Sequence, residues 1–233
     1  MKIALLGYGK MGQTIEKIAK ERGHSIVLKV DKNDTEYALE NAEVAIDFSV
    51  PDAAVSNITR CFEANVPVVS GTTGWLDHFE KMVTLCNRKN GAFIYASNYS
   101  LGVNLFFELN KKLASIMNTV EGYAIEMEEI HHTQKLDAPS GTAITLAEGI
   151  IEHHDQVKSW KLDEKEQKSI PIYAKRIENV PGTHTVTYAS EIDSIEIKHT
   201  AHNRQGFALG AVIAAEWLHD KKGVFTMKDV LGL

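Results

Sequence analysis

Cysteine and proline are scarce in this 233-residue sequence, which contains 2 Cys and 5 Pro. The two cysteines, Cys61 and Cys86, are too few for a disulfide framework and lack C-x-x-C spacing. We therefore expect a reducing, cytoplasmic location and interpret both as small buried side chains. The low proline content and a hydrophobic fraction of 44% exclude a collagen-like or wholly disordered chain. A folded globular protein is expected.

Positive charge and long apolar runs are also in short supply. The sequence has 25 Lys+Arg against 31 Asp+Glu, a net charge of −6, whereas a nucleic-acid binder needs a basic face to displace counterions from phosphates. No apolar run reaches the roughly 18 residues that span a bilayer, and the longest candidate, residues 207–218, is interrupted by Glu216. The short apolar run at residues 3–6 ends at Gly7 and does not fit a signal sequence. We expect no nucleic-acid partner and no membrane partner.

Short apolar runs alternate with amphipathic segments in the first half of the chain, which is typical of a parallel sheet with crossover helices. Strands are predicted at residues 3–6, 26–30, 44–48, 66–70 and 92–96, and helices at 12–22, 51–65, 76–90 and 103–117.

The pattern changes after Gly102. We predict strand-like structure at 122–130, a solvated charged loop at 158–168, alternating strands at 183–189 and 194–200, and helices at 142–153 and 207–219. The predicted fold is therefore α/β, with a Rossmann-like parallel-sheet domain (residues 1–102 and 205–233). An α+β domain with a mixed sheet (residues 103–204) is predicted to bind substrate and to mediate oligomerisation.

A glycine-rich turn joins the first predicted strand to the first predicted helix. Its sequence, Gly7-Tyr8-Gly9-Lys10-Met11-Gly12, fits G-x-G-x-x-G, and Asp31 follows the second strand. In this context the glycines permit a tight turn and a close approach to a pyrophosphate, while the acid accepts ribose hydroxyls. Asp31 favours NADH, but the adjacent Lys32 suits the 2′-phosphate of NADPH. We predict that one or both of these cofactors bind here.

Two further loops follow predicted strands, where a doubly wound sheet presents its ligand crevice. Either loop could be an ordinary turn, but their positions favour contact with the nicotinamide half of the cofactor. The candidate contacts are Gly71, Thr72, Thr73, Ser97, Asn98 and Tyr99.

The densest group of reactive side chains lies between residues 128 and 143. It includes His131, His132 and Lys135, followed by Ser140-Gly141-Thr142 at the start of a predicted helix. A helix N-terminus offers unpaired N–H donors, so this turn is a candidate cradle for a carboxylate or phosphate. A zinc site is not predicted, because adjacent histidines on a strand point to opposite faces. A second pair at residues 153–154 lacks basic or glycine-rich neighbours, and we interpret it as a solvated helix end.

The run HHTQKLDAPSGTA at residues 131–143 resembles the signature of the dihydrodipicolinate reductase family, the 4-hydroxy-tetrahydrodipicolinate reductases of lysine biosynthesis. Supporting similarities occur at residues 9–12, 46–49, 71–74, 98–104 and 204–211. Two features depart from the family pattern: the glycine loop is compact, and no glycine closely follows Arg176. The resemblance therefore assigns no role to Arg176.

The resemblance implies reduction of a cyclic dicarboxylate, with hydride delivered to ring C4 and a proton supplied by His131. It also implies that Lys135 balances negative charge and that His132, Ser140, Gly141 and Thr142 bind substrate. The cofactor is expected on the 7–12 loop, Asp31 with Lys32, residues 71–73 and residues 97–99. Family members generally form homotetramers through the sheet of the second domain, and we expect the same here.

Two other functions are compatible with the glycine motif. One is a Rossmann oxidoreductase that acts on another amino-acid-like or sugar-like substrate. The other is a nonenzymatic nicotinamide-binding redox sensor, which needs no proton donor and usually carries an additional partner-binding surface.

Overall fold

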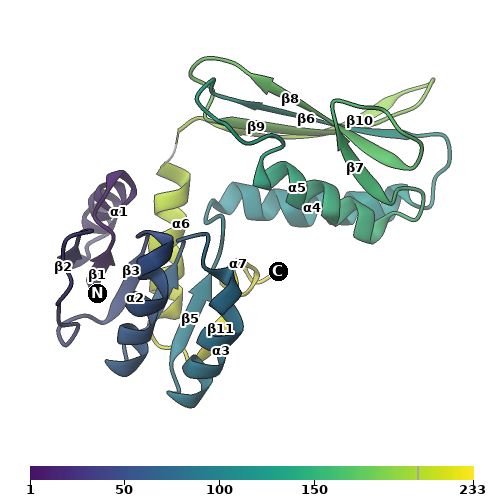
Figure 1. Ribbon diagram of the computed structural model, residues 1–233. Helices are drawn as coiled ribbons and strands as arrows, with labels where there is room; N and C mark the ends of the chain where they lie inside the picture. The colour runs from purple at the N-terminus through teal and green to yellow at the C-terminus, as the bar shows by residue number, and fades with distance from the viewer. Residues whose placement is uncertain (204) are drawn as a thin grey trace. The chain divides into compact units, whose positions relative to one another are not determined.

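The computed structural model describes residues 1–203 and 205–233, so Arg204 of the 204–211 motif lies outside the described residues. The chain divides into two compact units (Figure 1). Unit 1 comprises Met1–Asn104 and Gln205–Leu233, and unit 2 comprises Leu105–Arg204. The boundary predicted after residue 102 falls close to this division.

Unit 1 contains a six-stranded sheet in the order β11-β5-β4-β3-β1-β2, and every neighbouring pair is parallel. The strands are β1 (Lys2–Leu6), β2 (Ser25–Val30), β3 (Val44–Asp47), β4 (Val68–Ser70), β5 (Ala92–Tyr95) and β11 (Gly223–Phe225). The predicted Rossmann-like parallel sheet is confirmed. The short edge strand β11 was not predicted.

Helices cover both faces of this sheet because alternate side chains of each strand point to opposite faces. In β1, Ile3 and Leu5 share a core with α1 (Lys10–Glu21) and α6 (Gln205–Leu218). Ala4 and Leu6 pack in a second core with α2 (Pro51–Glu63) and α3 (Phe79–Arg88). The 3₁₀ turn η1 (Leu76–His78) precedes α3, and the short helix α7 (Met227–Leu231) follows β11.

Unit 2 contains a five-stranded mixed sheet in the order β10-β9-β6-β8-β7, which confirms the predicted mixed sheet. Its strands are β6 (Ala124–His131), β7 (Ser159–Leu162), β8 (Ser169–Arg176), β9 (Gly182–Ala189) and β10 (Ser194–Ala201). Strand β9 is antiparallel to both β6 and β10, whereas β6, β8 and β7 run parallel.

One face of this sheet packs on α4 (Leu101–Met117) and α5 (Gly141–His153), as Figure 1 shows. Along β6, Ile125 and Met127 point into this core, and the next two side chains on the same face are Glu129 and His131. The period-two alternation of the strand therefore carries two ionisable groups onto the buried face.

Two predictions in unit 2 were wrong. Residues 158–168 are not entirely a loop, because β7 forms an edge strand whose Trp160 packs partly into the core while Lys161 pairs with Glu166 outside it. The pair at residues 153–154 is not a solvated helix end, because His154 is only 4% exposed and its ring lies 6.4 Å from that of Tyr188. Among the described helices, none has the length and apolar content to cross a membrane.

Candidate functional site

The turn between β1 and α1 brings backbone against backbone in unit 1. Gly7 has φ of +98°, and a Cβ there would lie 2.2 Å from the carbonyl oxygen of Phe48, so only glycine fits. Gly9 caps α1 without any side-chain hydrogen bond. The helix N-terminus therefore keeps N–H donors for an anion, as the pyrophosphate of a dinucleotide requires.

A hollow of about 280 Å³ lies beside this turn. It is formed by the glycine loop, the end of β2, the segment after β3 and the start of α2, and β1 pairs with both β2 and β3 in the sheet. The hollow thus sits at the carboxyl ends of neighbouring strands, where α/β sheets bind ligands. Its lining residues are Gly7, Tyr8, Gly9, Val30, Asp31, Lys32, Asp34, Phe48, Ser49, Val50, Ala53 and Asn57.

Asp31 and Lys32 are both exposed at this hollow. The backbone N–H of Lys32 donates to Asp31 Oδ1 over 2.7 Å, and the N–H of Asp31 donates to Asp34 Oδ2 over 2.8 Å. The first bond orients the Asp31 carboxylate and the second fixes the Asp31 backbone, with Lys32 next to it in the chain. The arrangement accommodates either a ribose hydroxyl or a 2′-phosphate.

The remaining cofactor candidates lie at the ends of β4 and β5 and in the first turn of α1. Thr73 and Ser97 are exposed, Thr72 is buried, and Lys10 is exposed in the first turn of α1 beside Met11 and Gly12. Tyr99 is 1% exposed, and its hydroxyl donates to the carbonyl of Ser70 over 2.8 Å. The Tyr99 side chain therefore braces the ends of the strands, and its backbone packs closely against Gly210 of α6.

The chemistry-bearing side chains of unit 2 are centred on the end of β6. His131 Nδ1 lies 3.1 Å from Glu129 Oε2, although the approach is not aligned as a regular hydrogen bond. Glu129 is 0% exposed and His131 is 8% exposed. A buried carboxylate thus stands directly beside the imidazole.

Arg176 and His184 complete this cluster around Glu129. None of these three residues was assigned to the site from the sequence. Arg176 Nη2 lies 3.1 Å from Glu129 Oε1, and the Nε2 atom of His184 lies 3.8 Å from Glu129 Oε2. His184 Nε2 is also 3.0 Å from the hydroxyl of Ser140, which was predicted as a substrate contact. The strand register explains the meeting, because Glu129 pairs with His184 across β6 and β9, and His131 pairs with Arg176 across β6 and β8.

These contacts fix the charges in the cluster. Burial alone raises the pKa of Glu129, but the neighbouring side chains of His131, Ser140 and Arg176 overcome it and lower that pKa to about 2. Burial, with help from the neighbouring His131, lowers the pKa of His184 to about 3. At neutral pH Glu129 is therefore an anion and His184 a neutral ring.

Arg176 also shapes the segment that follows β6. Its guanidinium donates to the carbonyl oxygens of Asp137 over 2.7 Å and of Lys135 over 3.3 Å. Lys135 Nζ is paired with Asp137 Oδ2 at 2.7 Å, and this pairing lowers the pKa of Asp137. His132 is half-buried immediately after the strand. The predicted loop thus carries the cation Lys135, and Arg176 of β8 ties the loop to the cluster.

The loop ends at the N-terminus of α5. Ser140 is the N-cap, and its side-chain oxygen accepts the N–H of Ala143 over 3.2 Å. Gly141 is exposed and Thr142 is half-buried, so their backbone N–H groups remain at the surface of the first turn. The anion cradle predicted from the sequence falls on this turn, and anion binding there stays a prediction.

Glu129, His131 and His184 offer three ligand atoms within 4.8 Å of one another, a donor set that zinc accepts. Arg176 already places a positive charge against Glu129, and Ser140 hydrogen-bonds His184. A divalent cation would compete with both contacts, so we assign the cluster to proton and hydrogen-bond chemistry.

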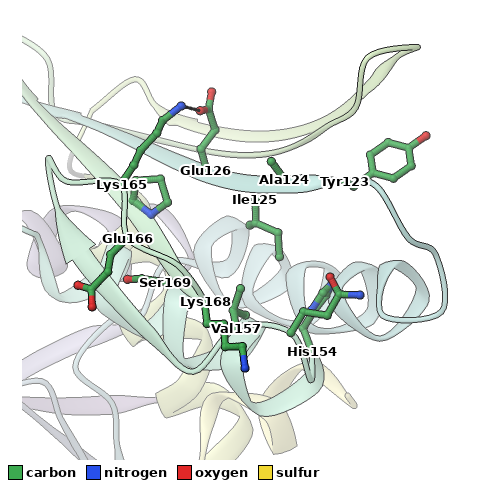
Figure 2. A pocket seen from close by; sticks show the side chains of 12 residues that line it. Tyr123, Ala124, Ile125, Glu126, His154, Val157, Lys165, Glu166, Lys168 and Ser169 are labelled. Atoms are coloured by element: carbon green, nitrogen blue, oxygen red, sulfur yellow. Dashed lines mark ion pairs between the residues drawn. The ribbon is translucent and has the colours of Figure 1, made fainter.

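A separate hollow of about 260 Å³ lies at the opposite end of β6 (Figure 2). It includes Ala124 and His154, with Lys165 paired to Glu126 at its edge. Seven residue-to-residue steps along the strand, roughly 23 Å, separate Ala124 from His131. None of the predicted site residues lines this hollow.

A parallel sheet whose first turn forms a dinucleotide crevice, in a chain that also carries a buried carboxylate–histidine pair, defines a reductase of the pyridine-nucleotide class. Family models for the N-terminus and the C-terminus of dihydrodipicolinate reductase match residues 1–99 and 102–231. The chain belongs to the dihydrodipicolinate reductase family. It is therefore a reductase of this family, whose curated relatives carry the name 4-hydroxy-tetrahydrodipicolinate reductase.

Relatives of the chain match it from end to end. The 4-hydroxy-tetrahydrodipicolinate reductase of Christiangramia forsetii is 64% identical, over 99% of this chain and 98% of its own. That of Thermosipho africanus is 35% identical over the same shares. Among solved structures, dipicolinate-bound dihydrodipicolinate reductase from Paenisporosarcina sp. TG-14 has a TM-score of 0.77 at 25% identity and 97% coverage of both chains.

Proposed function

We propose that His131 is the proton donor of the reduction and that the loop after it binds the dicarboxylate substrate. The observation that carries this proposal is the buried, ionised Glu129 at 3.1 Å from His131 Nδ1. An anion beside Nδ1 orients the imidazole ring. The other nitrogen, Nε2, is then the atom that gives up a proton.

Space at Nε2 is provided by Gly182 at the start of β9. A Cβ on Gly182 would lie 3.1 Å from His131 Nε2, closer than ordinary packing allows. The glycine therefore keeps this side of the ring open for a reacting atom.

Substrate carboxylates are bound by the two kinds of donor that this segment provides. Lys135 and His132 supply cationic or hydrogen-bonding side chains, while Gly141 and Thr142 present N–H groups at the positive end of the α5 dipole. Ser140 supports them by capping the helix and by contacting His184. Lys135 also balances negative charge that develops during the reaction.

The cofactor is NADH, NADPH or both, bound at the hollow beside the glycine loop. When bound, the reduced nicotinamide supplies a hydride, which the substrate receives at ring C4. Asp31 holds the ribose hydroxyls, Lys32 can pair with a 2′-phosphate, and the turn of residues 7–12 holds the pyrophosphate. Residues 71–73 and 97–99 are proposed to contact the nicotinamide half.

The chain is further proposed to act in the cytoplasm as a homotetramer joined through the sheet of unit 2. Strand β10 is an edge strand on which Ile195 and Glu196 are exposed, so the sheet can pair or pack with another copy. Light scattering tests this state, and a monomer mass across the working concentration range would contradict it.

The activity proposal is tested by following NADH oxidation with and without the product of dihydrodipicolinate synthase. Oxidation that requires this substrate and is lost in His131→Gln is expected. Cofactor binding without substrate-dependent oxidation would favour a redox sensor instead, and wild-type turnover in His131→Gln would remove this residue from the mechanism.

A further inference from the structure

A buried carboxylate in unit 1 lies behind the proposed cofactor crevice. Asp47 is the last residue of β3 and is 0% exposed. Burying a carboxylate without partners is costly, and burial raises the pKa of Asp47. A hydrophobic side chain would fill the position at lower cost, so the acid calls for an explanation.

Four side chains donate hydrogen bonds to Asp47. Its Oδ1 accepts from the Ser49 hydroxyl over 2.7 Å and from the Asn57 amide over 3.0 Å. Its Oδ2 accepts from the hydroxyls of Ser70 over 2.9 Å and Thr72 over 2.8 Å. The four bonds use all the acceptor sites of an ionised carboxylate.

The four donors come from different segments of unit 1, and Ser70 is the last residue of β4. Ser49 lies in the segment after β3, Thr72 lies in the loop after β4, and Asn57 lies on α2. Ser49 and Asn57 also line the hollow of about 280 Å³. Asp47 therefore ties together segments that are far apart in the sequence but adjacent at one edge of the sheet.

The direction of these bonds links the two loops directly. Because the Thr72 hydroxyl donates its hydrogen to Asp47, its oxygen is free to accept the backbone N–H of Ser49, over 2.8 Å. On the other side, the Tyr37 hydroxyl donates to Asn57 Oδ1 over 2.6 Å, which turns the NH₂ group of Asn57 toward Asp47. A neutral amide in place of the carboxylate would face donors on both sides and would break this order.

We propose that Asp47 is a positioning residue for dinucleotide binding, which sets the shapes of the segments 48–50 and 71–74 through its four hydrogen bonds. The inference rests on the proposed cofactor site. Asp47 itself does not contact the cofactor, because it is fully buried beneath the two loops.

The first test compares Asp47→Asn with Ser70→Ala. Asp47→Asn changes the acceptor of all four hydrogen bonds, whereas Ser70→Ala removes only one donor. Ser70 is part of β4, and its loss leaves the bonds from Ser49, Asn57 and Thr72 to Asp47 intact. NADH fluorescence titration should show a Kd raised about tenfold or more in Asp47→Asn and less than about threefold in Ser70→Ala. The substrate KM at saturating NADH should change little in either variant. Thermal melting measures the stability loss of both.

Unchanged NADH affinity in folded Asp47→Asn would overturn the inference. It would also be overturned if the two variants lost affinity in proportion to their fall in Tm, because that result indicates general destabilisation. Failure of the wild-type protein to bind NADH would instead reject the proposed cofactor site.

A second pair of variants covers the case in which Asp47→Asn does not fold. Thr72→Val keeps the side-chain shape but cuts the link from Asp47 to the backbone of Ser49, whereas Thr72→Ser keeps the hydroxyl. We expect weaker NADH binding in Thr72→Val and recovery to within about threefold of wild type in Thr72→Ser. Equal affinity in Thr72→Val and wild type would overturn the inference.

Discussion

Glu129 Oε2 and His131 Nδ1 lie 3.1 Å apart on the buried face of β6, with Arg176 holding the other carboxylate oxygen at 3.1 Å. Glu129→Gln removes the negative charge but keeps the shape. The imidazolium that donates the proton then loses its counter-charge, so kcat/KM should fall about 10²-fold. Steady-state kinetics and an NADH titration, which should be unchanged, check this prediction.

The neighbouring Glu128 offers a matched control. It points to the other face of β6 and pairs with Lys175, away from His131. Glu128→Gln should keep kcat/KM within about threefold of wild type, as an exposed ion pair contributes little. Equal losses in the two variants would show that charge on β6 in general, and not the contact with His131, matters.

His131→Gln and Lys135→Ala should each lower kcat/KM by about two orders of magnitude or more, because one removes the proton donor and the other a cation for the dianionic substrate. NADH binding should stay nearly intact, since both residues belong to unit 2 and the glycine loop to unit 1. Lys161→Ala, which removes a lysine of β7 paired with Glu166, is the matched control. Wild-type turnover in either site variant would exclude that residue from the reaction.

Local patterns account for the parts of the fold that the sequence predicts. Alternation of apolar runs and helices identifies the parallel sheet, and the spacing of Gly7, Gly9 and Gly12 identifies its first turn. These patterns do not predict strands β11 and β7, because β11 has only three residues and β7 is a charged edge strand. Helix α7, of five residues, is equally short.

The chemistry cluster shows where local patterns stop. Alternation along residues 124–131 would have placed Glu129 on the same face as His131, so that signal was present in the sequence. His184 and Arg176 reach the cluster only through the register of β9 and β8 against β6. Register between distant strands depends on packing of the whole sheet, which a single sequence does not display.

The cluster should make the protein less stable in acid. An unfolded chain protonates a histidine near 6.5, whereas folded His184 resists protonation until about pH 3, so stability falls as the pH decreases between these values. Glu129 adds a loss between its ordinary 4.5 and about 2, because its favourable ionised form disappears. Urea unfolding at several pH values should show this slope. His184→Gln should flatten it above pH 4.5, and an identical slope in that variant would contradict the assignment.

Gly182→Ala tests the open side of the imidazole. The added methyl group would lie 3.1 Å from His131 Nε2, where a reacting atom must approach. We expect kcat to fall about tenfold or more, since small misplacements at a reacting centre are costly. Gly122→Ala is a less suitable control because Gly122 has φ of +88°. Gly141→Ala has open space around its Cβ, but Gly141 belongs to the proposed substrate cradle. The control is therefore Glu191→Ala, at an exposed position. Equal activity in Gly182→Ala and Glu191→Ala would contradict the prediction.

Asp31 and Lys32 give the last prediction, on the choice of coenzyme. Both are exposed at the hollow, and one favours ribose hydroxyls while the other favours a 2′-phosphate. The wild-type protein should therefore use NADH, with measurable use of NADPH. Lys32→Ala should lower kcat/KM for NADPH about tenfold, the value of one charge-assisted contact, and should leave NADH within about twofold. Lys10→Ala, at the start of α1, should affect both coenzymes alike if that side chain acts on the shared pyrophosphate. A large preference of the wild type for NADPH, or equal effects of Lys32→Ala on the two coenzymes, would reject the assignment of Lys32 to the 2′-phosphate.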